Sequence, residues 1–471
     1  MRDVRAHHPV QTGSVCFDTE LIKRYDGRGP RYTSYPTALQ FTQGFDEAAW
    51  REAAQVSNRS GRPMSLYVHV PFCGSLCYYC GCNKIVTRNQ ARIQRYLDCL
   101  GKEIDRQAEL FDRDRVVQQL HFGGGTPTYL NDRQLCDLMA HLSTAFTLET
   151  GNEREFSIEI DPRTTHDETM ELLSKLGFNR VSLGIQDFNP QVQRAINRIQ
   201  STDDVMRLVE DARKFNYRSV SFDIIYGLPH QHVASFDQTL DHVLAMEPDR
   251  LAVYNYAHLP ARFKGQRMIR EEDLPTAAEK LEILKHTIQK LIDAGYVYIG
   301  MDHFARPDDD LAKARHDGTL QRNFQGYSTH GGSDLVSLGV SAISHIGSSY
   351  AQNAVSTSEY ETLLEAGKLP LKKGLTVDED DLLRADVIQE IMCHDGIDFE
   401  GFSARHGIEF SDYFANELNH LEPLARDGLI GVDTSGIHVT PKGRLLLRTV
   451  AMIFDRHLSG HAQDNRFSKA I

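Results

Sequence analysis

The chain alternates between short β-rich runs and amphipathic stretches with helical periodicity, and this alternation constrains its fold more than any other feature. The β-rich runs occupy residues 65–70, 117–122, 155–160, 180–185, 219–225 and 250–256. The helical stretches between them occupy residues 92–110, 132–146, 167–176, 203–215 and 236–245. Such repeats predict βαβ units and a parallel sheet. Periodicity alone does not decide between a closed or partial barrel and an open, doubly wound sheet.

Polar residues and glycines follow the β-rich runs. They are Cys73 after the first run, Gly123–Thr126 after the second, Glu159 and Asp161 at the third, Gln186 at the fourth and Asp223 at the fifth. In parallel α/β folds the chemistry lies at the carboxyl ends of the strands, so these residues should line one site. A run of glycines is often only a tight turn, but at a strand end it also lets the backbone approach a ligand closely.

Four of the eight cysteines, Cys73, Cys77, Cys80 and Cys82, fall within ten residues. The other four are scattered, and we expect them to be reduced. This clustering predicts a metal or redox centre rather than a disulfide framework. A structural zinc site more often uses two separated cysteine pairs, and a bacterial ferredoxin has a different spacing with a distant fourth cysteine.

The C-x3-C-x2-C spacing of Cys73, Cys77 and Cys80 suits a [4Fe–4S] cluster. Three thiolates hold three irons and leave the fourth iron without a protein ligand. S-adenosylmethionine (SAM) can chelate that iron through its amino and carboxylate groups. One electron then breaks a carbon–sulfur bond of SAM and gives a 5′-deoxyadenosyl radical. The spacing therefore predicts radical SAM chemistry.

The sequence after about residue 370 has a different texture. Helical patterns at residues 378–393, 399–406 and 411–426 precede a hairpin pattern at 428–440, and residues 442–454 have a further helical pattern. Helices followed by a hairpin resemble a winged-helix module. A DNA-reading helix would be basic. Because the helix before the hairpin carries mostly acids (Asp412, Glu417 and Glu422, against Arg426), we expect a packing or lid domain.

The chain carries 65 Asp and Glu against 52 Lys and Arg, a net charge of −13, which disfavours nucleic acid and anionic membranes as partners. It contains no run of ~18 uncharged apolar residues of the kind a membrane helix needs, and its first residues have no apolar signal-peptide core. We therefore expect a cytoplasmic protein. His7 and His8 are better explained as part of a solvated leader than as metal ligands.

Beyond these patterns, the chain resembles the oxygen-independent coproporphyrinogen III oxidases (coproporphyrinogen dehydrogenases), a family of the radical SAM superfamily. The resemblance rests on the segments 28–37, 80–88, 123–129, 184–189, 223–229, 255–258, 301–307 and 323–327. Haem chaperones of the same superfamily lack the run that follows Cys80, so Cys82 favours the oxidase. A haem-binding chaperone is the alternative, and an iron–sulfur protein without SAM chemistry is a third hypothesis.

The resemblance implies an α/β fold with a partial, TIM-like (β/α) barrel. It places an N-terminal extension at residues 1–55, the radical SAM barrel at 56–368 and a mostly helical, winged-helix-like C-terminal domain at 369–471. It also implies a monomer that receives electrons from a reductase or a flavodoxin-type donor.

The resemblance further implies one [4Fe–4S] cluster on Cys73, Cys77 and Cys80, and two SAM molecules side by side. The residues expected at the first SAM are Tyr67, Gly124, Glu159, Ala257 and Ile343. Those expected at the second are Tyr79, Gly125, Thr126, Gln186, Arg198, Asp223 and Gln325. Cys82 and Tyr67 are the candidate catalytic residues. Considered without the resemblance, Glu159 and Asp223 would suit helix caps or ion pairs, and Ile343 would suit the core.

The implied reaction converts two propionate side chains of coproporphyrinogen III to vinyl groups and gives protoporphyrinogen IX, as in haem biosynthesis. A radical removes hydrogen from the propionate β-carbon, and CO2 and one electron then leave. The substrate is a tetra-anion, so this acidic protein must place cations locally to hold it. Arg28, Arg31, Lys84 and Arg88 flank the recognised loops and are our candidates, with surface solvation as the alternative role.

Overall fold

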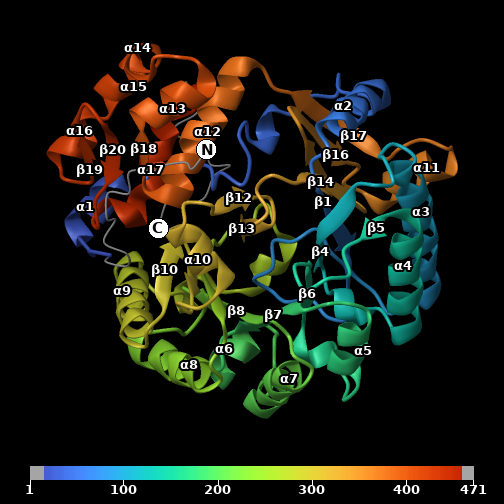
Figure 1. The fold of residues 1–471 in the computed structure, drawn as a ribbon. Helices are drawn as coiled ribbons and strands as arrows, with labels where there is room; N and C mark the ends of the chain where they lie inside the picture. The colour runs from blue at the N-terminus through green and yellow to red at the C-terminus, as the bar shows by residue number, and fades with distance from the viewer. Residues whose placement is uncertain (1–14, 459–471) are drawn as a thin grey trace. The chain divides into compact units, whose positions relative to one another are not determined.

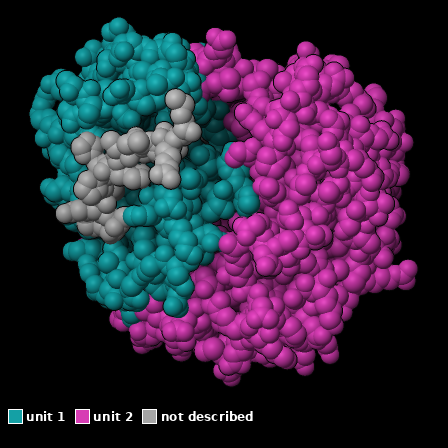
Figure 2. Space-filling model, viewed as in Figure 1, with its two compact units in different colours: residues 1–35, 284–331, 383–471 teal, residues 36–283, 332–382 magenta. Residues whose placement is uncertain are grey.

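The computed structural model describes residues 15–458, which fold into two compact units (Figure 2). Unit 2 contains residues 36–283 and 332–382, and unit 1 contains the described residues of the ranges 1–35, 284–331 and 383–471. The predicted domains are three consecutive segments of the chain, with boundaries after residues 55 and 368, and this division remains a prediction. Each unit instead gathers separate parts of the chain.

Unit 2 is built on one sheet with the strand order β9-β8-β7-β6-β4-β1-β14-β15-β16-β17. Its first part contains β9 (Arg250–Asn255), β8 (Ser219–Tyr226), β7 (Arg180–Gln186), β6 (Glu155–Ile160), β4 (Val116–Gly124), β1 (Met64–Val70) and β14 (Asp334–Leu338). These strands pair in parallel throughout. The predicted parallel sheet is therefore confirmed, and its linear order is that of a partial barrel.

Antiparallel strands extend the sheet at one edge. They are β15 (Ile343–Ile346), β16 (Ser349–Asn353) and β17 (Leu371–Thr376), while the short β5 (Thr147–Leu148) pairs with β4. The sequence patterns did not predict this extension. The reason is that its strands are short and lack a clear alternation.

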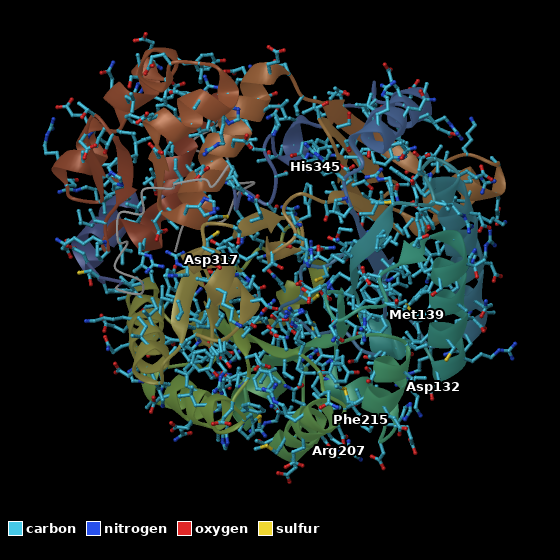
Figure 3. All side chains as sticks on the ribbon, viewed as in Figure 1. Asp132, Met139, Arg207, Phe215, Asp317 and His345 are labelled. Atoms are coloured by element: carbon cyan, nitrogen blue, oxygen red, sulfur yellow. The ribbon has the colours of Figure 1, made fainter. Side chains whose placement is uncertain are left out.

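Helices cover the outer side of the parallel strands (Figure 1). They are α3 (Gln90–Ala108), α4 (Asp132–Ala145), α5 (Thr169–Lys175), α7 (Thr202–Lys214) and α8 (Val233–Ala245). Each buries a stripe of apolar residues: in α4, Met139 is 4% exposed, whereas Asp132 at the start of the helix is exposed (Figure 3). Side-chain caps fix where these helices begin, as in the capping box formed by Asn131 and Gln134.

The described C-terminal residues of unit 1 form short helices and a small sheet. The helices are α13 (Phe399–His406), α14 (Phe410–Tyr413), α15 (Ala415–His420) and α16 (Glu422–Arg426), and the sheet has the order β18-β20-β19 (Gly396–Asp398, Gly436–Val439 and Ile430–Val432). The predicted hairpin is confirmed as β19 and β20. The prediction of one helix over 411–426 was wrong, because the backbone of the buried Phe414 leaves helical geometry between α14 and α15.

The prediction of a helix over 442–454 was only partly right. A 3-10 turn (Gly443–Leu446) precedes α17 (Leu447–Ala451), and a second 3-10 turn (Met452–Phe454) follows it. The predicted helix at 378–393 is α12 (Glu379–His394). Residues near the N-terminus pack against the C-terminal part within unit 1, since Tyr32 donates a hydrogen bond to Asp455 over 3.0 Å.

Several expectations concern the chain as a whole. All eight cysteines are free in the structure, and the reduced state of the four scattered ones remains a prediction. No helix between residues 15 and 458 is long and apolar enough to cross a membrane. His7 and His8 lie outside the described residues.

Candidate active site

The cysteine loop is anchored at both of its ends. Residues Phe72–Cys73 form the short strand β2, which pairs in parallel with β3 (Ile85–Val86). The start and the end of the cysteine loop therefore lie side by side. Cys73 and Cys77 are buried, Cys80 is partly buried and Cys82 is exposed. The loop therefore presents its first three thiols from within the fold and the fourth from its exposed tip.

A cavity of about 590 Å³ lies at the carboxyl ends of the parallel strands in unit 2. Fifteen of the residues singled out from the sequence line it: Cys73, Cys77, Tyr79, Cys80, Cys82, Lys84, Arg88, Gly124, Gly125, Thr126, Glu159, Asp161, Gln186, Arg198 and Asp223. They come from the cysteine loop that follows β1, from the ends of β4, β6, β7 and β8, and, for Arg198, from the segment between β7 and α7. The expectation that these strand ends form one site is therefore confirmed.

The glycine run after β4 lets two backbones approach each other closely beside this cavity. Gly124 has a φ of +115°, and a Cβ built on it would lie 2.5 Å from the ring of His69. A Cβ on Gly125 would lie 2.6 Å from the backbone of Pro71. The amide N–H groups of Gly125 and Thr126 donate to the carbonyl groups of Val70 and Phe72 over 2.8 Å. Glycine is thus required here, because a side chain would push the loop away from the end of β1.

A charged cluster surrounds the buried thiol of Cys77. Arg163 and Arg198 both pair with Asp161, over 2.7 and 2.9 Å, and both donate to the sulfur of Cys77, over 3.3 and 3.7 Å. Although burial opposes ionisation of Asp161, the two guanidinium groups lower the pKa of this carboxyl. Burial also opposes the charge of Arg198, but Tyr79, Asp161 and Cys77 raise its pKa. The cluster is therefore ionic, and both of its guanidinium groups contact the Cys77 sulfur.

Arg198 has one hydrogen-bonding group left over. Its Nη2 group donates to the carbonyl group of Gly184 over 2.5 Å, but its buried Nε has no partner. A buried donor without a partner is costly, and buried polar groups are normally satisfied. Because Arg198 also lines the cavity, it remains a candidate ligand-binding residue.

Glu159, which also lines the cavity, is held by the glycine run and by a histidine. It accepts hydrogen bonds from the Gly124 N–H over 3.1 Å and pairs with Nε2 of His121 over 3.3 Å. Burial works against ionisation, but the hydrogen bond and charge of His121 lower the pKa of Glu159. This carboxylate can therefore accept from an ammonium or hydroxyl group of a ligand.

Asp223 differs from Glu159 in its charge state. Burial, followed by the nearby charge of Glu159, raises the pKa of Asp223 to about 7. Ser182 donates a hydrogen bond to its Oδ2 over 3.2 Å. Near neutral pH this group is divided between its acid and its carboxylate, and a cationic ligand would favour the carboxylate.

Tyr67 lies behind the cavity wall rather than on it. Its ring stacks on His121, with centroids 5.7 Å apart and planes 14° from parallel, and its hydroxyl bonds to Nδ1 of His69 over 3.0 Å. Sequence reasoning missed both histidines. The available signal was a polar residue inside an apolar strand, in the runs Val68-His69-Val70 and Leu120-His121-Phe122.

Three other predicted SAM-binding residues do not line the cavity. Ala257 is connected to the cysteine loop through Gln266, whose Nε2 donates to the carbonyl groups of Ala257 and Tyr79 over 3.2 and 2.9 Å. Ile343 is a half-buried residue of β15. Gln325 belongs to unit 1, so its place at a SAM site remains a prediction.

Among the candidate cations for the substrate, Lys84 and Arg88 line the cavity. Lys84 is partly occupied, since its Nζ donates to the carbonyl group of Cys80 over 3.0 Å. Arg28 and Arg31 belong to unit 1, where Arg31 pairs with Asp302. Only the first two are therefore described at the site.

The donor set fits an iron–sulfur cluster. Cys73, Cys77 and Cys80 share one cavity, and Thr126 donates to the sulfur of Cys73 over 3.5 Å. Hydrogen bonds to cysteine sulfurs are typical of such clusters. Within residues 15–458, no three His, Cys, Asp or Glu side chains are grouped so that they could hold a single metal ion.

Comparison with known families and proteins gives a consistent picture. Residues 67–243 match the model of the radical SAM superfamily, and residues 377–446 match that of the HemN C-terminal domain. The first match covers the cysteine loop and the strands around the cavity. The second lies in the C-terminal part of the chain.

Similar proteins span nearly the whole chain. A protein of Pseudomonas aeruginosa named oxygen-independent coproporphyrinogen III oxidase is 51% identical over 97% of this chain and 99% of its own length. One of Salmonella typhimurium with the same name is 49% identical over the same shares. The solved structure of coproporphyrinogen III oxidase (HemN) from Escherichia coli, described as a radical SAM enzyme, is 48% identical. It has a TM-score of 0.90 and covers 94% of this chain and 100% of that one.

Proposed function

Since this chain belongs to the oxygen-independent coproporphyrinogen III oxidase family, we propose that it converts coproporphyrinogen III to protoporphyrinogen IX without oxygen, as a radical SAM oxidoreductase of haem biosynthesis. The observation that carries the proposal is the cavity at the strand ends, which gathers four thiols, three arginines and three carboxylates.

Cys73, Cys77 and Cys80 would hold a [4Fe–4S] cluster, and the remaining cavity residues would hold SAM. When bound, the cluster and SAM supply a 5′-deoxyadenosyl radical that can remove hydrogen from an unactivated carbon. Arg163 and Arg198 donate hydrogen bonds to the Cys77 sulfur, as is typical of cysteine ligands in iron–sulfur sites.

For each propionate group, one hydrogen atom is transferred to the deoxyadenosyl group, the carboxylate leaves as CO2, and one electron is released. One SAM becomes methionine and 5′-deoxyadenosine. Two propionates therefore consume two SAM molecules. This stoichiometry supports the proposal that two SAM molecules bind side by side.

We assign the two SAM molecules to two sets of residues at and around the cavity. The first would meet Tyr67, Gly124, Glu159, Ala257 and Ile343. The second would meet Tyr79, Gly125, Thr126, Gln186, Arg198, Asp223 and Gln325. The free Nε of Arg198 and the carboxylate of Asp223 suit the carboxylate and ammonium groups of an amino acid.

Lys84 and Arg88 would pair with propionate groups of the substrate, because they are the candidate cations that line the cavity. Arg28 and Arg31 would supply further contacts from unit 1. Cys82 would position the substrate or pass a proton, since its exposed thiol also lines the cavity. Tyr67 would support the first SAM by stacking on His121.

We further propose that the enzyme is a cytoplasmic monomer that takes electrons from a reductase or a flavodoxin-type protein. Its sequence would comprise an N-terminal extension, a radical SAM barrel and a C-terminal domain at 1–55, 56–368 and 369–471.

Anaerobic incubation with coproporphyrinogen III, SAM and dithionite tests the proposed function. We expect protoporphyrinogen IX, with two equivalents each of 5′-deoxyadenosine and CO2. A Cys77→Ala variant, purified and reconstituted in the same way, is the control and should give none. Stoichiometric haem binding by the wild-type protein without turnover would establish the chaperone instead.

A further inference from the structure

A basic surface lies on the outer side of the cysteine loop. We use this name for the exposed side chains of Arg194, Arg262, Lys264 and Arg267. They belong to the segments 189–202 and 257–270, and neither segment contains an aspartate or a glutamate. The two segments therefore carry a local excess of positive charge in a chain whose net charge is −13.

The segment around residue 265 packs directly on the cysteine loop. Gln266 donates to the Tyr79 carbonyl over 2.9 Å, and a Cβ built on Gly81 would lie 3.1 Å from the ring of Phe263. A Cβ on Gly265 would lie 3.5 Å from Leu76 and from the Tyr78 carbonyl. The segment around residue 265 therefore covers the loop residues that flank Cys77 and Cys80, namely Leu76, Tyr78, Tyr79 and Gly81.

The segment around residue 196 contacts the same part of the loop. The Tyr78 N–H donates to the Ile196 carbonyl over 2.9 Å, and Asn197 donates to the Leu76 carbonyl over 2.7 Å. Ile196 and Ile269 also belong to one apolar cluster, against which Tyr78 packs. The two basic segments therefore meet over the cysteine loop and form one surface.

The cations of this surface are available to a partner. Within residues 15–458, none of the four forms an ion pair, whereas the neighbouring Arg270 is neutralised by Glu272 and Asp273. Two large apolar side chains are exposed among them, Ile199 at 64% and Met268 at 61%. None of these residues lines the cavity.

We propose that the basic surface is the docking site of an acidic one-electron carrier protein, which reduces the cluster through the cysteine loop. This inference rests on the proposed function, because that reaction needs an electron at the cluster. In each encounter the carrier is oxidised by one electron and the cluster is reduced by one. Exposed cations around a small apolar centre match the anatomy of transient protein interfaces.

The test uses a variant in which three of the four charges of the basic surface are reversed: Arg262→Glu, Lys264→Glu and Arg267→Glu. The matched control reverses three exposed cations on α2 (Glu47–Ser60), on α3 and after α11 (Thr357–Glu365): Arg59→Glu, Lys102→Glu and Lys368→Glu. These three also form no ion pair in the described part of the chain. Both variants carry the same change in net charge, so a general effect of charge would alter them equally.

The measurement is the rate at which reduced flavodoxin, a strongly acidic carrier, bleaches the cluster absorbance in an anaerobic stopped-flow experiment. Electrostatic steering raises association rates by about 10- to 10³-fold, so we expect the surface variant to be reduced at least about tenfold more slowly at low salt. The difference should shrink at high salt. The control variant should retain the wild-type rate. Equal rates in the two variants would refute the docking site.

Dithionite separates this proposal from the proposed function. As a small reductant it needs no docking surface, so the surface variant should bleach and turn over normally with it. If dithionite supports no turnover in the wild-type protein, the proposed function fails, while the flavodoxin bleaching rates still test the docking site. A single Arg194→Glu variant, expected to slow flavodoxin more weakly than the triple variant, provides a test if the triple variant misfolds; a wild-type rate in both would also refute the site.

Discussion

Each end of the parallel sheet in unit 2 holds a buried arginine–aspartate pair, and the two pairs differ in how completely they are satisfied. At the amino ends of the strands, Arg115 pairs with Asp334 over 2.7 Å, with both side chains at most 3% exposed. At the carboxyl ends, Arg198 pairs with Asp161 over 2.9 Å, with both at most 8% exposed. Burial alone therefore does not distinguish them.

The amino-end pair is satisfied entirely by the protein. Arg115 also donates to the Arg62 carbonyl, to Ser57 and to Asn58, while Asp334 accepts from Ser57 and from the Gly347 N–H. The carboxyl-end pair instead leaves the Nε of Arg198 without a partner and contacts the thiol of Cys77. All polar groups of the amino-end pair thus have partners within the protein, whereas the carboxyl-end pair retains one donor without a partner.

The largest effect expected at the carboxyl end concerns Cys82. Cys82→Ser should assemble a normal cluster and bind SAM, yet lose most decarboxylation, by about 10²- to 10⁴-fold if the thiol moves a proton. Iron and sulfide analysis, SAM binding and product formation are measured on the same anaerobic sample. Loss of the cluster would make Cys82 a ligand, and full activity would make it a packing residue.

The amino-end pair should respond in stability. Arg115→Met leaves the Asp334 carboxylate buried and without its cation, so we expect a loss of roughly 3–5 kcal/mol in the free energy of unfolding. Urea denaturation followed by circular dichroism measures it. The double variant Arg115→Met, Asp334→Leu should recover much of this loss, because two apolar groups need no partner. A double variant as unstable as the single one would contradict the account.

Arg198→Met should show the opposite balance. Asp161 keeps its second cation, Arg163, so stability should fall less than in Arg115→Met. The contact to the second SAM is lost, and a charge-assisted hydrogen bond contributes roughly 1.5–3 kcal/mol, or about 10- to 150-fold in affinity. Equilibrium dialysis with SAM, together with the cluster spectrum, tests this. Unchanged affinity for both SAM molecules would remove Arg198 from the site.

The smallest effect is a pH dependence. In the folded protein the pKa of Asp223 is raised to about 7, so SAM binding to its carboxylate should strengthen as pH rises through 7, by up to about tenfold per unit below that value. The folded chain also holds a proton that the unfolded chain releases near pH 4, so this group lowers stability as pH rises from about 4 to 7. Asp223→Asn should flatten both profiles. An unchanged slope in that variant would exclude Asp223 as the titrating group.

The strands and the cysteine loop could be predicted because their signals are local. Apolar runs and helical periodicity are read within about ten to twenty residues, and the spacing of Cys73, Cys77 and Cys80 is read within eight. The interruptions of the predicted helices at Phe414 and Leu446 could not be predicted in this way. Their backbones follow the packing of buried side chains rather than local propensity.

The sequence by itself determined the parallel sheet, the end of the sheet that holds the site, and the thiols that could hold a cluster. Only the tertiary structure decided which charged groups are fully paired within the protein and which keep a hydrogen-bonding atom without a partner. Arg115 and Asp334 are 219 residues apart, and Arg198 and Asp161 are 37 apart. No local pattern encodes such pairings, because they depend on which strand ends the fold brings side by side.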